Sequence, residues 1–410
     1  MTARPRVMVI YGTRPEAIKL APVVRALQES AYVDVIVAVT GQHRAMLDQV
    51  NSLFGIVPDV DLDVIRPRQQ LHEMTGRILS GLTVAIRDLA PDAVMVQGDT
   101  TTTFVAALAA FYEKVPVLHV EAGLRTDERY NPFPEEINRR LTSQLSSLHL
   151  APTASSRANL VRDGITPTDV VVTGNTVIDA LLDVVSRSLP LEDPALSVLG
   201  HGPSVLITSH RRESWGEPMA RTANAIARLA KVFPDVRFLL PAHLNPVVRE
   251  VLVPPLEGFG NVTITEPLSY SDFAHAMAMS SICLTDSGGV QEEAPSLGKP
   301  VLVLRDTTER PEAVESGTVR LVGTDEDVIV QEVATLLTEP SAYDAMAHAV
   351  NPYGDGRASA RIRAAVEAFF GAGERLADWG SAVRAGAVSV PAQRTGAPTP
   401  TQEASLPQIR

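Results

Sequence analysis

Short runs of apolar residues alternate with helix-like segments along almost the whole chain. In the first half the apolar runs are residues 7–11, 35–39, 93–96, 115–120 and 170–172. In the second half they are residues 205–207, 236–240, 262–264, 282–284, 301–304 and 319–322. Because these runs are rich in Val, Ile and Leu and do not alternate with polar residues, they predict strands buried on both faces, as in parallel sheets covered by helices.

Helical periodicity fills the intervals between these runs. In residues 15–28, for example, Ala17, Leu20, Val24 and Leu27 recur at the spacing of one helix face. Strand and helix patterns alternate through both halves of the chain, so the sequence predicts two doubly wound, Rossmann-like α/β domains with parallel sheets.

Changes in composition suggest the domain limits. Residues 186–203 are rich in Pro, Gly and Ser, and a second interruption lies at residues 351–356. We expect a first domain of residues 1–175, completed by a returning helix at 357–370, and a second domain of residues 176–356. The last segment, 371–410, has the Ala, Gly, Pro, Thr and Ser content of a disordered tail.

Composition narrows the classes of partner. Of the 410 residues, 45% are apolar, which is enough for sizeable cores, and the net charge of −12 argues against nucleic acid or an anionic membrane as partner. The single cysteine, Cys283, excludes an internal disulfide and is expected in a core. The sequence has no metal-site signature and no long apolar N-terminal segment, so we expect a soluble, cytoplasmic protein without a metal.

Residues 285–311 carry the densest chemistry. A predicted strand runs into Ser287-Gly288-Gly289 and then into a helix. Adjacent glycines let the backbone approach a ligand, and a helix start attracts phosphate. Glu292 and Glu293 follow within the first turns, where a carboxylate can hold a ribose diol, and Arg310 lies one strand further on. The segment predicts a socket for a nucleotide diphosphate; the alternative is an ordinary strand–turn–helix unit.

Charged residues also follow the other predicted strands, at the edge where parallel sheets bind ligands. Arg14 and Lys19 come after the first strand; the alternative is a solvated helix start. Asp99 follows the strand at 93–96 and is either a helix N-cap or a catalytic group. Glu121 emerges from a buried strand, so a raised pKa would suit a general acid or base; the alternative is an ion pair with Arg125.

Two adjacent carboxylates, Glu135 and Glu136, open another predicted helix. Adjacent residues on a helix diverge by about 100°, so only one of the two can face a cleft. Ile137 and Leu141 define the expected buried stripe, and the alternative role of both acids is to complement the helix dipole.

Histidines and arginines follow two strands of the second half. His210 and Arg211 suit a pyrophosphate or leaving group, or else belong to a solvated basic loop. His243 is either a further ligand contact or a histidine of a capping loop.

In combination, these segments resemble the non-hydrolysing UDP-N-acetylglucosamine 2-epimerases. The matching runs extend from residue 7 to about residue 360 and include YGTRPEAIKLAPVV, QGDTTTTFVAALAAF, HVEAGLRT, FPEEINRRLT, SHRRES, PAHLNPVVRE, LTDSGGVQEEAPSLGKPVLVLRDTTERPEAV and NPYGDGRAS. Ser209 departs from the glycine that is common in the family before the histidine. The resemblance implies a glycosyltransferase-B-like pair of domains with the active site in the cleft between them.

The resemblance also implies a reaction: UDP leaves the sugar, 2-acetamidoglucal forms, and UDP adds back after C2 has been inverted. It assigns acid–base roles to Asp99, Glu121 and Glu135, and so favours Glu135 over Glu136, with His210 beside the reacting groups. The implied substrate contacts are Arg14, Lys19, His243, Ser287, Gly288, Gly289, Glu293 and Arg310. A second, activating substrate site would use Gln42, His43, Arg68 and Arg211. The family needs no cofactor, is commonly a homodimer and serves polysaccharide biosynthesis.

Three other functions fit the same sequence features. A hydrolysing 2-epimerase would release N-acetylmannosamine and UDP from a similar site. A glycosyltransferase of the same architecture would need an acceptor groove and would leave C2 untouched. A non-catalytic nucleotide-sugar sensor would bind substrate without needing the carboxylates.

Overall fold

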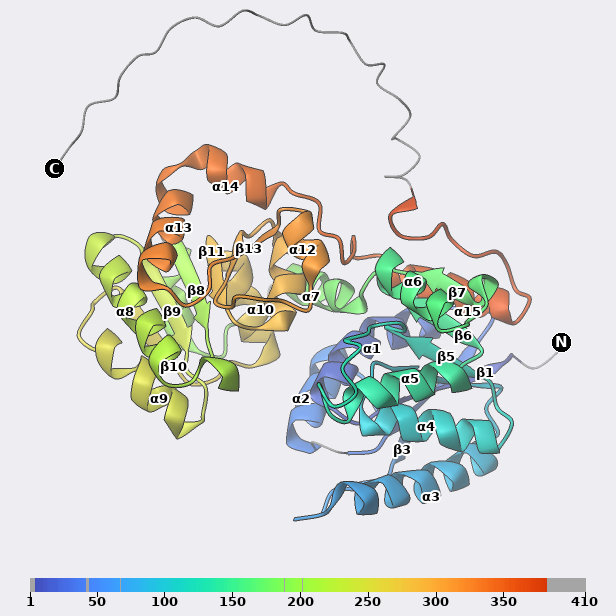
Figure 1. Cartoon of the computed structure of the whole chain (residues 1–410). Coiled ribbons are helices and arrows are strands. Elements are labelled where there is room, and N and C mark those ends of the chain that lie inside the picture. The colour runs from blue at the N-terminus through green and yellow to red at the C-terminus, as the bar shows by residue number, and fades with distance from the viewer. Residues whose placement is uncertain (1–3, 42–43, 67, 188, 201, 382–410) are drawn as a thin grey trace, which may run out of the picture. The chain divides into compact units, whose positions relative to one another are not determined.

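Two parallel sheets organise the chain, as the apolar runs predict (Figure 1). The computed structural model describes residues 4–41, 44–66, 68–187, 189–200 and 202–381. The chain divides into two compact units, Met1–Trp379 and Gly380–Arg410, and both sheets belong to the first. The predicted α/β class with two doubly wound sheets is therefore confirmed.

The first sheet has seven strands in the order β3-β2-β1-β4-β5-β6-β7, and the second has six in the order β10-β9-β8-β11-β12-β13. The strands of the first sheet are β1 (Arg6–Tyr11), β2 (Asp34–Val39), β3 (Val60–Asp61), β4 (Ala93–Gln97), β5 (Val117–Val120), β6 (Leu148–Ala151) and β7 (Val170–Val172). Those of the second are β8 (Ser204–Thr208), β9 (Arg237–Pro241), β10 (Val262–Thr265), β11 (Ile282–Thr285), β12 (Val301–Val303) and β13 (Val319–Leu321).

Each predicted apolar run forms a strand, but the sequence pattern missed β3 and β6. The first of these has only two residues, and the second reads Leu-His-Leu-Ala, so neither gives a continuous apolar run.

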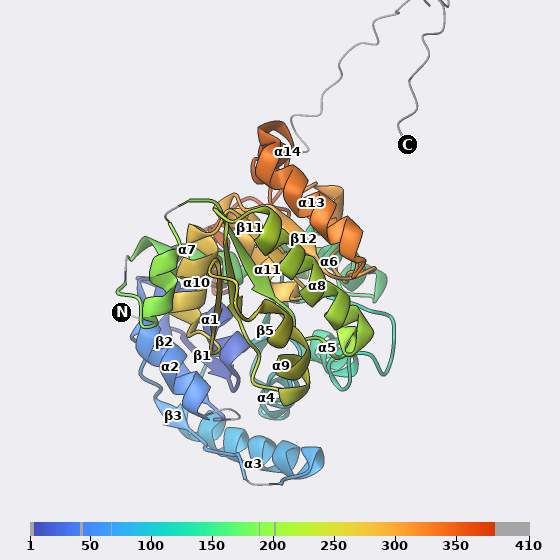
Figure 2. The ribbon, with the colours of Figure 1, turned by 90° about the vertical axis from the view of Figure 1, so that its left-hand side faces the viewer.

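Helices cover both faces of each sheet (Figures 1 and 2). The helices of the first half are α1 (Arg14–Gln28), α2 (Arg44–Phe54), α3 (Leu71–Leu89), α4 (Thr101–Tyr112), α5 (Glu135–Leu145), α6 (Ala154–Arg162) and α7 (Thr176–Ser186). Those that follow are α8 (Glu217–Val232), α9 (Pro246–Leu252), α10 (Tyr270–Met279), α11 (Gly288–Glu293), α12 (Pro311–Glu315), α13 (Glu326–Thr338), α14 (Pro340–Ala347) and α15 (Ala358–Phe369). Within the described part of the chain, no helix has the length and apolar run that a bilayer crossing needs.

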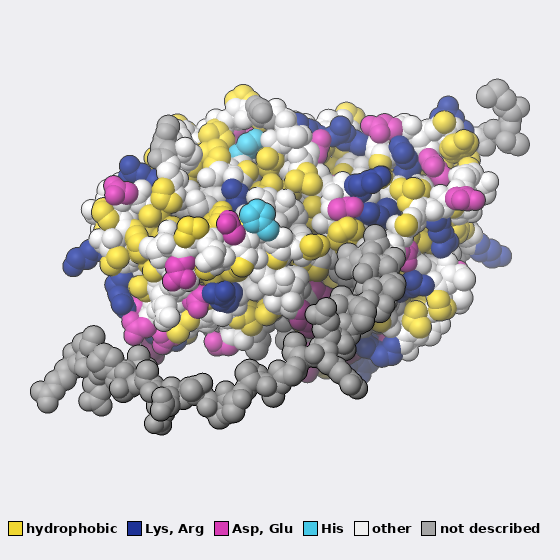
Figure 3. Space-filling model, turned by 90° about the horizontal axis from the view of Figure 1, so that it is seen from above, with side chains coloured by type: hydrophobic (Ala, Val, Ile, Leu, Met, Phe, Trp, Pro, Cys, Tyr) yellow, Lys and Arg dark blue, Asp and Glu magenta, His cyan; other side chains and the backbone are white. Residues whose placement is uncertain are grey.

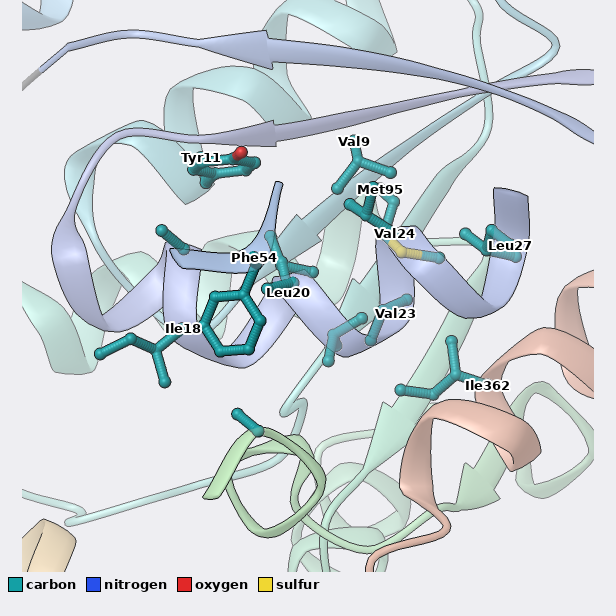
Figure 4. Packing of buried hydrophobic residues seen from close by; sticks show 14 of the residues in the cluster. Val9, Tyr11, Ile18, Leu20, Val23, Val24, Leu27, Phe54, Met95 and Ile362 are labelled. Atoms are coloured by element: carbon teal, nitrogen blue, oxygen red, sulfur yellow. The ribbon is translucent and has the colours of Figure 1, made fainter. Parts of the chain in front are cut away.

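The core of the first sheet is built around α1. Its predicted apolar face is buried, and Leu20, Val24 and Leu27 are fully enclosed. Figure 4 shows these side chains together with Val9 of β1 and Ile362 of α15. The helix begins with a capping box, in which the Glu16 carboxylate accepts the backbone N–H groups of the preceding loop. Packing and capping therefore fix the start of α1, where Arg14 lies.

The two segments that join the halves pack on α1. Helix α7 lies against α1, and α15 contacts both. The Asp179 carboxylate of α7 accepts the backbone N–H groups of Ala358 and Ser359, at 3.1 and 2.8 Å, and so caps α15. The sequence placed α7 in the second domain, but its apolar side chains belong to the core of the first sheet. Helix α7 also contacts α10 and α11 of the second half, so it packs on both halves.

The predicted tail begins too early. The backbone N–H of Trp379 donates to the Val172 carbonyl at 2.8 Å, and the Val172 N–H donates to Asp378 Oδ1 at 3.1 Å. The Trp379 indole N–H also donates to the Pro352 carbonyl at 3.0 Å. The chain is thus attached to β7 as far as Trp379, and the remainder of the predicted tail, from 382 onward, lies outside the described residues.

We expect Leu20→Ala to lower the free energy of unfolding by about 2–5 kcal/mol, because it removes a fully buried side chain from a packed helix face. Urea unfolding followed by circular dichroism measures the loss. The matched control is Leu244→Ala, whose side chain is 67% exposed and whose truncation should change stability by less than about 0.5 kcal/mol. Equal losses in the two variants would contradict the packing argument.

Candidate active site

The strand orders place the candidate residues at two topological switch points. In the first sheet the order reverses between β1 and β4, and in the second between β8 and β11. Parallel sheets bind ligands beyond the carboxyl ends of strands at such points. Arg14 follows β1 and Asp99 follows β4, whereas His210 follows β8 and Ser287 follows β11. The topology therefore brings the predicted residues to the edge of each sheet that suits binding.

Asp99 is held by helix α5. The Arg139 guanidinium donates to Asp99 Oδ2 from Nη2 at 2.5 Å and from Nε at 3.1 Å. The Asn138 amide donates to the Asp99 backbone carbonyl at 3.0 Å. The alternative role as a helix cap is wrong, because Thr100 is the N-cap of α4 and its hydroxyl accepts the Thr103 N–H.

Glu121 pairs with Lys19. The Lys19 ammonium lies 2.5 Å from Glu121 Oε1, and the Gln97 amide donates to the other carboxylate oxygen. Burial raises the pKa of Glu121, and Lys19 opposes that shift. The predicted alternative, an ion pair with Arg125, is wrong, because Arg125 binds Asp163 at 2.8 Å.

The Glu121 backbone has a φ of 61°, in the left-handed region that a non-glycine residue seldom adopts. A strained backbone of this kind is maintained by its surroundings. At Glu121 these surroundings are the ion pair with Lys19 and the hydrogen bond from the Gln97 amide.

The two acids at the start of α5 have different surroundings. Glu136 is fully buried, and its carboxylate accepts from Arg140 Nε at 2.7 Å and from the Thr126 backbone N–H at 3.0 Å. Glu135 instead has a buried oxygen, Oε2, with no hydrogen-bond partner among the described residues. The geometry therefore singles out Glu135 as the acid with an uncommitted oxygen.

The buried face of α5 is polar. It consists of Glu136, Asn138, Arg139, Thr142 and Ser143. Leu141, predicted to belong to an apolar stripe with Ile137, is 44% exposed, so that expectation is wrong. The helix packs against charged and polar groups such as Asp99, which apolar periodicity does not report.

His210 is fixed by Asp286, a residue that the sequence reasoning did not select. Asp286 Oδ2 accepts the backbone N–H groups of His210 and Arg211, at 2.7 and 2.9 Å, and its Oδ1 lies 3.1 Å from His210 Nδ1. Burial raises the pKa of Asp286, but contacts with His210 outweigh it and the net shift is downward. The position of Asp286, directly after β11 and before Ser287, was the available signal.

The His243 ring stacks on His210, with ring centroids 5.7 Å apart. The two histidines therefore come together, from the ends of neighbouring strands β9 and β8. His243 therefore lies beside His210, as a contact of both histidines with one ligand requires.

Arg310 lies against the Ser287–Gly289 turn. A Cβ atom at Gly288 would be 2.5 Å from Arg310 Nη1, so glycine permits the close approach. Arg310 Nε donates to Glu292 at 2.7 Å, and its Nη1 donates to Glu309 at 2.9 Å. Burial lowers the pKa of Arg310, but these carboxylates outweigh it and raise the pKa above its ordinary value.

Glu292 and Glu293 divide in the same way as the pair on α5. Glu292 Oε2 accepts the Asn175 amide at 3.1 Å, and its backbone carbonyl accepts the Asn351 amide at 2.9 Å. Glu292 thereby ties Arg310 to both segments that join the two halves. Glu293, the predicted ribose contact, faces the Tyr270 hydroxyl at 3.3 Å. Burial, followed by the charge of Glu292, raises the pKa of Glu293 to about 8.

Charged groups from the two sheets act on one another. Burial lowers the pKa of Lys19, but Glu121 of the first sheet and Glu292 of the second outweigh it and raise the pKa. Burial lowers the pKa of Arg14, and Tyr270 and Glu293 of the second half oppose this effect. Charged groups of both halves therefore act on Lys19 and on Arg14.

The structure describes two of the four predicted activator residues. Gln42 and His43 lie outside the described residues. Arg68 is exposed with a φ of 57°, and Arg211 is bound to Glu309 at 2.8 Å.

On the face seen from above, basic and acidic side chains lie interspersed (Figure 3). Among the residues with described positions, no group of three or more His, Cys, Asp or Glu is arranged to hold a metal ion.

Comparisons with known proteins identify relatives of this chain. The family model described as UDP-N-acetylglucosamine 2-epimerase matches residues 25–367. The UDP-N-acetylglucosamine 2-epimerase of Escherichia coli K12 is 50% identical over 369 residues, which cover 88% of this chain and 98% of that protein. The enzyme of the same name from Bacillus subtilis is 52% identical over 357 residues, covering 87% and 93%.

Solved structures are similar over the same span. The Neisseria meningitidis UDP-GlcNAc 2-epimerase bound to UDP-GlcNAc has a TM-score of 0.79 and 49% identity, covering 89% of this chain and 100% of that one. A Methanocaldococcus jannaschii homologue in complex with UDP-GlcNAc and UDP has a TM-score of 0.71 and 32% identity, covering 89% and 99%. The glycotransferase of kitacinnamycin, at 11% identity and a TM-score of 0.60 over 89% and 99%, shares the fold alone.

We expect Glu293→Gln to make stability less dependent on pH. Since the fold raises the pKa of Glu293 from 4.5 to about 8, the folded protein holds a proton that the unfolded chain has lost within this window. Stability therefore falls as pH rises from about 5 to about 8, by at most about 1.4 kcal/mol per pH unit from this group. Urea unfolding across that range measures the slope.

The glutamine variant lacks the titrating proton, so its slope should be shallower than that of the wild type. The control is Glu217→Gln, an 84% exposed carboxylate, which should leave the slope unchanged. Identical slopes for wild type and Glu293→Gln would show that this carboxyl titrates normally.

Proposed function

We propose, from the fact that this chain belongs to the UDP-N-acetylglucosamine 2-epimerase family, that it interconverts UDP-N-acetylglucosamine and UDP-N-acetylmannosamine without hydrolysis. One observation carries the proposal. At the carboxyl edges of the sheets, Lys19 of the first half lies 2.5 Å from Glu121 and also interacts with Glu292 of the second half. Arg14 of the first half likewise interacts with Glu293 of the second. A site for breaking a sugar–phosphate bond and moving a proton needs both kinds of group.

The chemistry requires the nucleotide to leave. The C2 proton of the sugar is not beside a carbonyl, so a carboxylate alone cannot remove it. As the C1–O bond breaks, its electron pair leaves with UDP, a carboxylate takes the C2 proton, and the electron pair of the C2–H bond forms the C1=C2 double bond of 2-acetamidoglucal. A proton then adds to C2 from the opposite face while a UDP oxygen bonds to C1, so that no atom is gained or lost.

Basic groups stabilise the departing diphosphate in this scheme. Arg310 and the Ser287–Gly289 turn lie together, and Arg14 and His210 follow the strands at the two switch points. We assign these four positions to the diphosphate, and Glu293, beside Tyr270, to the ribose hydroxyls. Lys19 and His243 complete the proposed substrate contacts.

Proton transfer at C2 needs groups on both faces of the sugar. Asp99, Glu121 and Glu135 are the proposed donors and acceptors. They come from three different elements, the ends of β4 and β5 and the start of α5, so they can approach one ring from different directions. Glu135 is distinguished by its uncommitted oxygen and Glu121 by a pKa that burial raises.

Retention of UDP separates this proposal from a hydrolysing 2-epimerase. The glucal must be kept from water until UDP returns, which requires a closed site. Glu292 accepts hydrogen bonds from Asn175 and Asn351, which lie in the two segments that connect the halves of the chain. These bonds suit a site in which the two halves move together. The relatives bound to UDP-GlcNAc support the substrate class. Homodimer formation, cytoplasmic location, a polysaccharide pathway and the activating site remain predictions from the family resemblance.

Incubation of the enzyme with UDP-N-acetylglucosamine in D₂O tests the proposal. We expect proton NMR to show UDP-N-acetylmannosamine accumulating and deuterium entering C2 of both sugars, because C2 loses its hydrogen in each turnover. Asp99→Asn, Glu121→Gln and Glu135→Gln should each slow exchange by about 10²–10⁴ with UDP still bound. Asp327→Asn, an 85% exposed carboxylate on α13, is the matched control and should match the wild type.

The competing functions give different spectra. Free N-acetylmannosamine accumulating in place of the UDP-linked epimer would identify a hydrolysing enzyme. Epimer formed with the original C2 hydrogen would refute the elimination mechanism. A sensor or a transferase without acceptor would leave C2 unlabelled.

A further inference from the structure

Arg139 connects two carboxylates that the proposed reaction uses. It lies on α5, is only 8% exposed, and directs two N–H groups at Asp99. Glu135 lies four residues earlier on the same helix, and residues at that spacing share a helix face. We propose that Arg139 is a positioning residue that fixes the Asp99 carboxylate and its separation from Glu135. This inference rests on the proposed acid–base role of Asp99.

The geometry commits one oxygen of Asp99 and leaves the other available. Nε and Nη2 of Arg139 both donate to Oδ2, at 3.1 and 2.5 Å, whereas Oδ1 has no hydrogen-bond partner in the described chain. The Asp99 side chain is 24% exposed, so Oδ1 remains accessible to a ligand. Charge-assisted bonds of this kind are short and directional. Arg139 therefore anchors one oxygen while the other is directed to the sugar.

The Asp99 backbone is held by the same helix. The Asn138 side chain donates to the Asp99 carbonyl at 3.0 Å. Two consecutive residues of α5 thus hold the main chain and side chain of a residue that follows β4. Movement of α5 would carry Asp99 and Glu135 together, which keeps their spacing constant.

A purely structural role for Arg139 would be to neutralise the buried Glu136. Arg139 Nη1 does lie 3.2 Å from Glu136 Oε2. Glu136, however, already accepts from Arg140 Nε at 2.7 Å and from the Thr126 N–H and hydroxyl at 3.0 and 3.1 Å. Glu136 therefore has other partners, whereas Arg139 is the one cation among the described residues that bonds Asp99.

Arginine suits this role better than lysine. Its guanidinium is a rigid planar fork, so two of its N–H groups can fix one carboxylate in orientation. A lysine at the same position would supply the charge without the fork. Arg140→Lys is the matched control, because Arg140 is on the same helix and binds the same Glu136. Its ion-pair partners among the described residues are Glu136, Asp127 and Asp163, and they do not include Asp99.

The test measures kcat and KM for epimerisation of UDP-N-acetylglucosamine in five proteins: wild type, Arg139→Lys, Arg140→Lys, Asp99→Asn and the double variant Arg139→Lys/Asp99→Asn. We expect Arg139→Lys to lower kcat about 10- to 100-fold, with KM within about twofold of wild type, because misplacing a proton-transfer group slows the chemical step more than binding. Arg140→Lys should retain the wild-type kcat.

The double variant separates positioning from packing. If Arg139 acts through Asp99, adding Arg139→Lys to Asp99→Asn should lower kcat by less than about twofold further. The same factor in both backgrounds, or a wild-type kcat for Arg139→Lys alone, would overturn the inference. UDP calorimetry and thermal melting check that each variant is folded.

A second variant covers the case in which Arg139→Lys does not fold. We expect millimolar guanidinium, but not ammonium, to restore turnover to Arg139→Ala, because guanidinium supplies the missing fork. A folded Arg139→Ala that guanidinium does not restore would overturn the inference. Failure of the proposed function gives a different result: a wild type without C2 exchange, or an Asp99→Asn variant with wild-type kcat.

Discussion

The direction of the strands is the constraint on which the site depends. Every observed strand pairing is parallel, so each sheet delivers its ligand-facing loops to a single edge. The order reverses between β1 and β4 and again between β8 and β11, and the chain leaves each reversed pair in opposite directions. Arg14 and Asp99 follow the strands at the first point, and His210 and Ser287 follow those at the second. Topology alone therefore brings together, at each point, groups that are far apart in the sequence.

Ion pairing then determines which of these side chains is free to contact a ligand. A buried charge without a partner is costly, so most acids at the site have a cation: Asp99 has Arg139, Glu121 has Lys19 and Glu292 has Arg310. The chain as a whole is acidic, with a net charge of −12, and the site must therefore gather its cations locally. The basic groups Arg139, Lys19 and Arg310 are thus already held in place by carboxylates. Preorganised charge of this kind needs little rearrangement when a leaving group develops negative charge.

The sequence predicted what apolar periodicity and motif spacing report, and little of the polar burial. Apolar runs located most strands, and the face of α1 was correct, because burial of aliphatic side chains has a regular period. The interior face of α5 is polar, so the same reasoning selected the exposed Leu141 in place of Arg139. Ion pairs between residues that are far apart in the sequence were also missed. Arg125 was assigned to Glu121 because the two are close in the chain, but in the fold Arg125 pairs with Asp163. Asp286 had no signal beyond its place at a strand end. The Glu135–Arg139 spacing of four residues was a usable signal, since it places both side chains on one face.

Adjacent acids on the two helices α5 and α11 follow one physical rule. Neighbouring side chains on a helix point about 100° apart, so they cannot share an environment. On α5, Glu136 is enclosed by Arg140 and Thr126, whereas Glu135 keeps an oxygen uncommitted. On α11, Glu292 is enclosed by Arg310 and Asn175, whereas Glu293 faces Tyr270 and has a pKa raised to about 8. In each pair one acid is held by hydrogen bonds from other parts of the chain, and the other has fewer partners. The sequence shows two equivalent carboxylates in each case, and only the partners that reach one of them from elsewhere in the chain distinguish the two.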